Sequence, residues 1–389
     1  MKNILSLVLM ILLSIIFLPI KKKNNKIIIN SFKNNKYNFY SRVFFEYLIK
    51  NKEKNNLIVK FVINNKEERD RLNQTIGPYF IDSKTFKGII EILSSKYWIS
   101  SCKPIYSFPL ALLNRMKINV WHGVPFKTIA LKDKNQNKIK KIIYKYYYSN
   151  IFYDLFLCSS SETSKLFKES FSLNEKNIYI GGSLAGEMFG ESIDKVSNDV
   201  VKNLLQQGRK KKVLYAPTYR DNGKTIYFPF PEMEKNEFES FLKEHDITIY
   251  VRPHHLDQGY KKYITWDGIE YFGSDLVPEI TFYLKEFDIL ISDYSSIIFD
   301  YMLTDGYQIL LPYDKVEYER VRGLNYKIKD LSYGKIVFSY DDFKNSIAFP
   351  YENIDRKNKL KNRFHSIDSF QCNKLLNRII VEHKNERNN

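Results

Sequence analysis

Four short segments each place polar residues at the end of an apolar, strand-like run. In chain order they are Asn119–Pro125 (NVWHGVP), Leu214–Asp221 (LYAPTYRD), Val251–His255 (VRPHH) and Ile289–Ser296 (ILISDYSS). In open α/β sheets, ligands bind beyond the carboxyl ends of the strands. We therefore predict that these four segments carry the chemistry of the protein.

The fourth segment has a pattern that is typical of a phosphate site. Ser295 and Ser296 precede an apolar, helix-like stretch, Ile297–Leu303. Serine hydroxyls and the backbone N–H groups of a helix start would then lie together, and the amino end of a helix binds phosphate. The alternative is that the two serines only cap the helix.

Histidine is rare in this chain, and three of its six histidines lie in these segments: His122, His254 and His255. An imidazole, with an ordinary pKa of about 6.5, can take a proton from an attacking hydroxyl at neutral pH. His122, which is followed by Gly123 in a tight, proline-containing loop, is therefore a candidate catalytic base. His254 is a second candidate. A histidine at a strand end can equally be structural or solvated.

Arginine can hold a phosphate group through two parallel hydrogen bonds, which lysine cannot. Arg220 and Arg252 follow the second and third strand-like runs, and Arg322 precedes Gly323 in a later loop. Each is a candidate phosphate ligand, with a surface ion pair as the alternative. No P-loop, GxGxxG, HExxH or DxD-type motif accompanies them, so no cofactor and no metal are expected. The set suits transfer of an activated phosphate group through positioning and charge stabilisation.

Alternation of short β-branched or aromatic runs with amphipathic stretches predicts βαβ units and parallel sheets. The first series of expected strands is Lys26–Asn30, Leu57–Ile63, Tyr97–Ser101, Ile118–Trp121, Leu155–Cys158 and Ile178–Ile180. The second series is Val213–Ala216, Thr248–Val251, Ile289–Ser292, Ile309–Leu311 and Ile336–Ser339. The polar segment Glu191–Lys212, with a basic run from Arg209, separates the two series. We predict two Rossmann-like domains facing a cleft, residues 26–200 and 205–350, followed by a helical segment, residues 353–389.

The composition limits the classes of protein and partner. A chain of 389 residues suits two domains of ordinary size. Its net charge of +17 favours anionic membranes or phosphorylated substrates, although lysine supplies 48 of the 61 basic residues and a base-composition bias of the genome is an alternative source. The charge is spread thinly without a nucleic-acid-binding motif, so nucleic acid is not an expected partner. Three cysteines that lie far apart disfavour a disulfide scaffold or a zinc site.

The chain begins with an uncharged apolar run, Ile4–Ile20, which a lysine cluster follows. A helix needs about 20 apolar residues to span a bilayer, with about 17 as the lower limit. No small-residue cleavage site follows the run, and the positive charge behind it favours a cytoplasmic location for the rest of the chain. We predict that residues 1–25 form a membrane anchor or a monotopic segment. A cleaved signal peptide or a buried element are the alternatives.

Taken together and in this order, the polar segments resemble the CDP-glycerol glycerophosphotransferase family, the primases and polymerases of wall teichoic acid and related capsules. The resemblance spans residues 115–325 and rests on WHGVPFK (Trp121–Lys127), YAPTYRD (Tyr215–Asp221), RPH (Arg252–His254), SDYSS (Ser292–Ser296), FDY (Phe299–Tyr301), Tyr313–Asp314 and Arg322–Gly323. It implies a two-domain fold similar to that of GT-B glycosyltransferases. It also implies a peripheral membrane protein on the cytoplasmic side of the cell membrane, because the acceptor of the family is lipid-linked.

The same resemblance implies a reaction. An acceptor hydroxyl attacks the β-phosphorus of a CDP-polyol, most simply CDP-glycerol, and CMP is released. His122 matches the general base for the acceptor hydroxyl, and His254 matches a second essential histidine near the donor diphosphate. Ser295 and Ser296 match the pair that holds this diphosphate.

The remaining matched positions are expected to bind or orient the substrates. Asp293 and Asp300 match acidic positions that orient the loop and the polyol, and Arg322 matches an arginine that contacts phosphate. Gly123, Arg220 and Arg252 lie within the matched motifs and are expected to contact substrate.

One stretch departs from the family. Many relatives carry Gly-x-Pro-Arg-x-Asp where this chain has GSLAGE (Gly182–Glu187), which leaves the polyol and the acceptor open. The length favours a primase or a capsule-type transferase over a long polymerase. The runner-up function is a GT-B nucleotide-sugar glycosyltransferase, which would release a nucleoside diphosphate. A non-catalytic membrane-bound binder is the third alternative, and the oligomeric state is open.

Basic and aromatic residues alternate in Lys138–Tyr148 (KIKKIIYKYYY). As a helix, this stretch could lie at a membrane interface with its tyrosines at headgroup depth and guide a lipid-linked acceptor. The alternative is a helix that packs on the first domain and holds its lysines in solvent.

Overall fold

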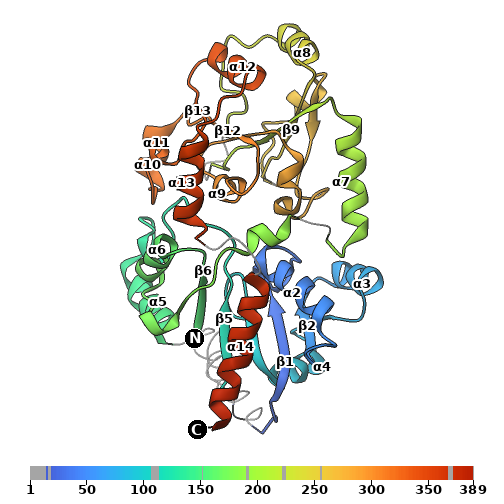
Figure 1. Cartoon of the computed structure of the whole chain (residues 1–389), viewed down its shortest axis with the longest axis vertical. Coiled ribbons are helices and arrows are strands. Elements are labelled where there is room, and N and C mark those ends of the chain that lie inside the picture. The colour runs from blue at the N-terminus through green and yellow to red at the C-terminus, as the bar shows by residue number, and fades with distance from the viewer. Residues whose placement is uncertain are drawn as a thin grey trace, which may run out of the picture. The chain divides into compact units, whose positions relative to one another are not determined.

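The computed structural model of the chain describes residue 15 and residues 19–106, 114–150, 152–189, 192–220, 225–254, 256–366 and 371–388. The predicted membrane segment, Ile4–Ile20, lies outside these residues except for Ile15, Pro19 and Ile20. Within the described ranges, no helix combines the length and the apolar character that a membrane crossing requires. The chain divides into two compact units, each with its own sheet (Figure 1).

Unit 1 comprises residues 1–122, 136–187 and 365–389. Its described strands form a parallel seven-stranded sheet in the order β3-β2-β1-β4-β5-β6-β7. The strands are β1 (Lys23–Asn30), β2 (Ile58–Val62), β3 (Phe80–Ile81), β4 (Ser95–Ser100), β5 (Met116–Asn119), β6 (Leu155–Cys158) and β7 (Ile178–Ile180). Its helices are α2 (Phe39–Asn51), α3 (Lys66–Thr75), α4 (Phe86–Leu93), α5 (Lys138–Asn150), α6 (Ser161–Phe171) and α14 (Gln371–Asn388).

Unit 2 comprises residues 123–135 and 188–364. Its described strands form a parallel six-stranded sheet in the order β10-β9-β8-β11-β12-β13. The strands are β8 (Lys211–Ala216), β9 (Ile247–Val251), β10 (Ile269–Tyr271), β11 (Ile289–Ser292), β12 (Tyr307–Leu310) and β13 (Lys335–Ile336). Its helices are α7 (Lys195–Gln207), α8 (Lys235–Glu244), α9 (Ile297–Tyr301), α10 (Lys315–Val321), α11 (Ile328–Leu331), α12 (Tyr340–Ala348) and α13 (Ile354–Phe364).

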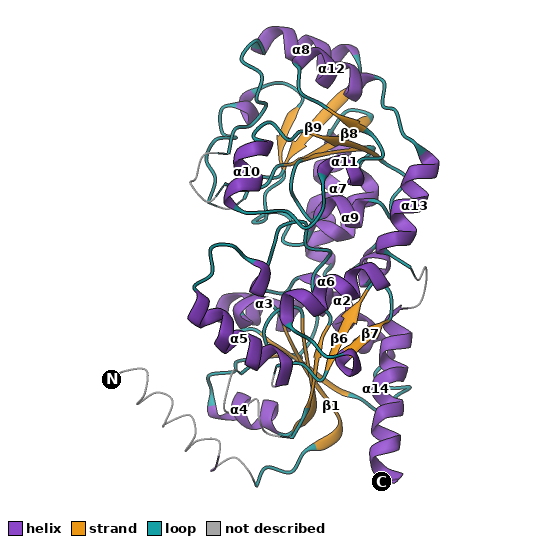
Figure 2. Cartoon of the chain, turned by 90° about the vertical axis from the view of Figure 1, so that its left-hand side faces the viewer, coloured by secondary structure: helices purple, strands orange, loops and turns teal. Residues whose placement is uncertain are grey.

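Both sheets are covered by helices on their two faces (Figure 2), and the burial of the strands agrees with this. Every residue of β6, β9 and β11 is buried. Parallel strands that are covered on both faces read as continuous apolar runs, which is the pattern from which they were predicted. In each sheet the strand order reverses once, between β1 and β4 in unit 1 and between β8 and β11 in unit 2. Such a reversal opens a crevice at the carboxyl ends of the strands, where ligands bind.

The prediction of an α/β fold with two Rossmann-like sheets is confirmed. The division of the chain differs from the expected boundaries, and residues 188–200 and 353–364 belong to unit 2. Residues 123–135 belong to unit 2, because Asn325 donates from Nδ2 to the carbonyls of Pro125 (3.0 Å) and Lys127 (2.7 Å). Residues 365–389 belong to unit 1, where the backbone N–H of Cys372 donates to Glu187 Oε1 at 2.6 Å.

Candidate functional site

His122 ends the first of the three chain segments that make up unit 1, and it follows the carboxyl end of β5. The imidazole is half-buried and stacks with the rings of Phe39 (centroids 4.8 Å apart) and Trp121 (4.2 Å). Its Nδ1 lies 2.6 Å from the carbonyl oxygen of Ser101, the residue that follows β4. A carbonyl oxygen can only accept a hydrogen bond, so Nδ1 carries the hydrogen. The neutral ring then has its lone pair on Nε2, which is the nitrogen that can take a proton.

The backbone that carries His122 is held in a strained conformation by Asn119. Trp121 has φ 58°, a left-handed value that is uncommon for a large residue. Asn119 is fully buried; its Oδ1 accepts from the N–H of Trp121 at 2.7 Å, and its Nδ2 donates to the carbonyl of Cys102 at 2.7 Å. Strain of this kind, about 1–3 kcal/mol, persists only where the surroundings over-determine it. Asn119 therefore fixes the turn that aims the imidazole.

The thiol of Cys102 also faces His122, with Sγ 3.8 Å from Nδ1. Burial raises the pKa of this thiol to about 12. Cys102 is therefore a neutral thiol at physiological pH and adds no charge beside the imidazole.

A buried ion-pair network lies at the strand reversal of unit 2. Arg220, which follows β8, donates from Nη2 to Asp293 Oδ2 (2.9 Å), and its Nε donates to Asp314 Oδ2 (2.7 Å). Its third nitrogen, Nη1, donates to the carbonyl of Thr218. Asp293 Oδ1 accepts from the N–H groups of Thr218 (2.8 Å) and Tyr294 (2.6 Å). The network therefore ties the loop after β8 to the loop after β11.

Three tyrosine rings surround the guanidinium of Arg220. Its Cζ lies 5.1 Å from the ring centroid of Tyr294 and 4.9 Å from the centroids of Tyr313 and Tyr318. Burial alone would lower the pKa of Arg220, but the charge of Asp293 and the hydrogen bond to Asp314 raise it above its ordinary value. Arg220 is thus a permanent cation whose three nitrogens bind protein groups, and its contact with substrate stays a prediction.

Ser295 and Ser296 are half-buried and stand directly before α9. Ser296 is the residue that precedes the helix, yet its side chain makes no capping hydrogen bond. Ser295 Oγ accepts from the N–H of Ile297 at a long 3.4 Å. Among the described residues, the two hydroxyls therefore make only one weak hydrogen bond to the start of the helix. The prediction that they bind phosphate stays open.

Gly123 lies over Asp300, a buried residue of α9. The glycine has φ +105°, which L residues rarely adopt, and a Cβ placed on it would lie 3.5 Å from Asp300 Oδ2. The loop that contains Gly123 is fixed further along, where Thr128 Oγ1 donates to the carbonyl of Arg322 at 2.6 Å. The structure thus brings Gly123, Asp300 and the backbone of Arg322 into one part of unit 2.

Arg252 and His254 follow β9 and are half-buried. Arg252 donates from Nη1 to the carbonyls of Phe272 (3.2 Å) and Val277 (2.9 Å), and burial lowers its pKa to about 10, so it is still a cation at neutral pH. His254 stacks on Tyr219 with ring centroids 4.6 Å apart, and its Nδ1 accepts from the N–H of Leu256 at 3.4 Å. That bond leaves the ring hydrogen of the neutral form on Nε2. His255 lies outside the described residues.

Comparison with known proteins then decides the family. The family model described as CDP-Glycerol:Poly(glycerophosphate) glycerophosphotransferase matches residues 11–380. The chain belongs to this family. The family that the sequence motifs resemble is therefore confirmed, and with it a phosphotransferase of teichoic-acid synthesis as the class of enzyme.

Individual proteins of teichoic-acid synthesis are similar to the chain in sequence, and a solved structure is similar to it in fold. The chain is 28% identical to the teichoic acid glycerol-phosphate primase of Bacillus subtilis (strain 168) over 68% of this chain and 70% of that protein. It is 26% identical to the teichoic acid poly(ribitol-phosphate) polymerase of Bacillus spizizenii over 69% of this chain and 45% of that protein. A structure of the wall teichoic acid polymerase TagF, a histidine variant soaked with CDPG, matches with a TM-score of 0.74 at 20% identity and covers 99% of this chain and 98% of that one.

The sequence patterns did not single out three residues that lie beside the candidate site residues. Asn119 and Thr218 lie inside quoted motifs, and Asp314 lies in the Tyr313–Asp314 pair, but none was given a role. Thr218 is buried and its Oγ1 meets no hydrogen-bond partner among the described residues. The described residues also contain no cluster of His, Cys, Asp and Glu that could hold a metal ion.

Proposed function

We propose that the chain transfers a polyol phosphate, most simply glycerol phosphate, from a CDP-polyol to a hydroxyl of a lipid-linked acceptor in teichoic-acid or capsule synthesis. The acceptor oxygen forms a bond to the β-phosphorus, and the bond from this phosphorus to the oxygen that bridges the two phosphates breaks. CMP leaves with that bridging oxygen. The proton of the acceptor hydroxyl passes to His122 Nε2.

The observation that carries this proposal is the hydrogen bond from His122 Nδ1 to the carbonyl of Ser101. This bond selects the tautomer in which Nε2 is basic, and a positioned base contributes about 10²–10⁴-fold to rate. The Asn119 turn aims the ring in the absence of substrate. Because the ring is already oriented, its orientation adds no entropy cost to the activation free energy of the reaction.

The proposal assigns donor binding to unit 2. The strand reversal between β8 and β11 supports a diphosphate site at Ser295 and Ser296, whose loop Asp293 and Arg220 hold in place. Asp300 of α9 and the adjacent Gly123 lie in the same unit. Further polar groups of unit 2 are supplied by Arg252, His254 and Arg322. In this proposal unit 1 holds the acceptor and unit 2 holds the donor, as the two halves of a GT-B-like enzyme do.

The acceptor places the enzyme at the cytoplasmic face of the membrane, and helix α5 supports this part of the proposal. Ile139, Ile142, Ile143 and Tyr146 are 49–71% exposed and repeat at the spacing of one helical face. Lysines flank this face at positions 138, 140, 141 and 145. An exposed apolar stripe with a basic border is typical of a helix that lies in a membrane interface.

Replacing Ile139, Ile142 and Ile143 with serine is therefore expected to reduce binding to phosphatidylglycerol vesicles by about tenfold or more, because each buried apolar side chain contributes about 1.5–3 kcal/mol. Replacing Lys138, Lys140 and Lys141 with glutamate should weaken binding in a salt-dependent way. Vesicle flotation measures both effects. Unchanged binding in both variants would contradict a role of α5 at the membrane.

Replacing Thr218 with valine tests donor binding by unit 2. The change removes the Oγ1 hydroxyl, which lacks a partner among the described residues, at nearly constant volume. A hydrogen bond to a charged group contributes about 1.5–3 kcal/mol, so we expect the KM for CDP-glycerol to rise by about tenfold without loss of stability. Initial rates of CMP release against donor concentration give this value, and Thr218→Ser, which keeps the hydroxyl, should retain the wild-type KM. An unchanged KM in the valine variant would exclude Thr218 from the donor site.

The proposed function as a whole is tested by CMP release from CDP-glycerol and from CDP-ribitol in the presence of a lipid-linked acceptor analogue. Acceptor-dependent CMP from one donor would establish the reaction and identify the polyol. No CMP from either donor, with release of a nucleoside diphosphate from a nucleotide sugar, would instead support the glycosyltransferase alternative. The stretch Gly182–Glu187, which differs from the Gly-x-Pro-Arg-x-Asp pattern of many relatives, would then be the first candidate for the cause of the changed donor specificity.

A further inference from the structure

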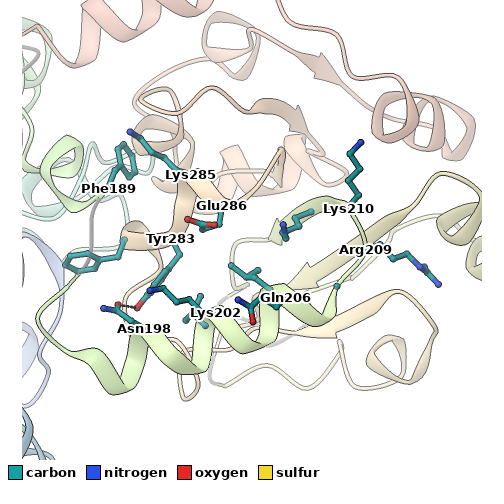
Figure 3. A pocket seen from close by; sticks show the side chains of 14 residues that line it. Phe189, Asn198, Lys202, Gln206, Arg209, Lys210, Tyr283, Lys285 and Glu286 are labelled. Atoms are coloured by element: carbon teal, nitrogen blue, oxygen red, sulfur yellow. Dashed lines mark hydrogen bonds between the residues drawn. The ribbon is translucent and has the colours of Figure 1, made fainter.

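A basic groove lies at the end of unit 2 opposite the proposed donor site. It has a volume of about 470 Å³, and Figure 3 shows it between α7 and the 3-10 helix η7 (Ile280–Glu286). Lys212, the second residue of β8, lines it, whereas Ala216 ends this strand on the donor side. Four residues of extended chain span about 13 Å, so the groove is separate from the strand reversal.

The lining of the groove is strongly cationic. Its lining residues include one carboxylate, Glu286, and five basic residues, of which Arg209 is paired with Asp267; the other four are Lys202, Lys210, Lys212 and Lys285. Lys210 and Lys212 form no ion pair with any described residue, and Lys212 is half-buried. Several ammonium groups around one groove with a single lining carboxylate favour an anionic ligand.

The floor of the groove is apolar. Val201 and Leu205 of α7 are buried in the core of unit 2, and Phe189 and Tyr283 pack against this core. Tyr283 is fixed by a hydrogen bond from its hydroxyl to Asn198 Oδ1 at 2.8 Å (Figure 3). Lys285 lies over the ring of Phe189, 5.0 Å from its centroid. The ligand must therefore offer both negative charge and carbon surface.

The arrangement of the charges favours several phosphates over one. A site for a single phosphate usually converges on it and often uses the two-pronged guanidinium of arginine. Here Arg209 points away from the groove in Figure 3 and is occupied by Asp267 (2.5 Å) and the carbonyl of Ile247 (3.1 Å). The lysines are instead distributed along the groove, from Lys285 near Phe189 to Lys210 beyond the end of α7.

We propose that this groove binds a polyol-phosphate chain, the phosphodiester product that earlier transfers have built. This inference rests on the proposed function, because each transfer adds one phosphodiester and one polyol to the acceptor. Alternating phosphates and short carbon units match a groove with lysines along its rim and an apolar floor. Holding the grown chain at a second site raises its effective concentration near the enzyme between transfers.

Binding of a lipid-free glycerol-phosphate hexamer to the full-length protein tests the proposal. The test variant replaces Lys202, Lys212 and Lys285 with glutamine. The matched control makes the same change at Lys243, Lys261 and Lys335, which are exposed, belong to unit 2 and do not line the groove. We expect the test variant to bind at least about tenfold more weakly at low salt, with the slope of log affinity against log salt reduced by about 2, and the control to bind as the wild type does.

Three outcomes would overturn the proposal: no binding of the hexamer to the wild type, equal binding by the test and control variants, or equally tight binding of a single-stranded RNA hexamer with the same loss in the test variant. If the test variant loses binding to phosphatidylglycerol vesicles but still binds the hexamer, the groove contacts a membrane surface instead. CMP release with an acceptor that carries one polyol phosphate is measured in parallel. If the wild type releases no CMP, the proposed function is contradicted. If the wild type releases CMP but does not bind the hexamer, only the proposed role of the groove is contradicted.

Discussion

Replacing His122 with asparagine is expected to lower the rate of CMP release by about 10²–10⁴-fold, which is the contribution of a positioned general base. The asparagine amide can still donate a hydrogen bond to the carbonyl of Ser101, as Nδ1 does in the wild type at 2.6 Å. It carries no nitrogen in the position of Nε2. The variant thus keeps the contact that orients residue 122 and removes only the atom that takes the proton.

Two controls separate catalysis from folding. His245→Asn changes a histidine that follows α8, outside the polar motifs, and should leave the rate near that of the wild type. Binding of CDP-glycerol to the His122→Asn protein, measured by calorimetry, should be nearly unchanged because His122 is assigned to the acceptor hydroxyl. His122→Ala is measured as well. If His122→Asn and His122→Ala both retain the wild-type rate, His122 is not the base, and the alternative of a non-catalytic membrane-bound binder gains support.

The strands of both sheets could be predicted because burial on two faces leaves a clear trace in the sequence. The runs Leu155–Cys158 and Ile289–Ser292 have the bounds that β6 and β11 have in the structure. Strands β3 and β10, which contain two and three residues and lie at the edges of their sheets, were missed, whereas β7, a three-residue edge strand, was predicted with its bounds. Such short segments carry too little periodicity to separate strands from loops reliably.

The positions of the site residues at the strand ends could be predicted, but their partners could not. Arg220 is paired with Asp293, 73 residues away, and with Asp314, 94 residues away. A local pattern contains no information about such contacts, so the sequence could indicate Arg220 as a phosphate ligand but not the buried ion pairs that hold its guanidinium. Its contact with substrate stays a prediction. The inclusion of residues 123–135 in unit 2 depends in the same way on Asn325, 200 residues from Pro125.

The boundary between His122 and Gly123 has a consequence for the mechanism. Adjacent residues belong to different units, with His122 held by Ser101 and the loop after Gly123 held by Thr128 and Asn325. His122, the proposed base, is thus held by contacts within unit 1, while the loop that follows it is held by contacts within the unit to which we assign the donor.

Replacing Arg220 with methionine is expected to lower the free energy of unfolding by about 3–5 kcal/mol, because it leaves a buried carboxylate without its cation. The side chain of Asp293 is 2% exposed, so water cannot replace the guanidinium. Urea unfolding followed by circular dichroism measures the change. The matched control is Arg209→Met: Arg209 pairs with Asp267, whose side chain is 67% exposed, and an exposed pair contributes only about 0.2–1 kcal/mol.

A double variant identifies the cause of that loss. Combining Arg220→Met with Asp293→Asn removes the uncompensated charge while the amide keeps an oxygen for the N–H groups of Thr218 and Tyr294. The double variant should therefore be more stable than Arg220→Met alone, which is the non-additivity that coupled residues show. A loss in Arg220→Met no larger than that in Arg209→Met would mean that the ion pair does not hold the loops after β8 and β11. Ser295 and Ser296 would then depend on other contacts for their position.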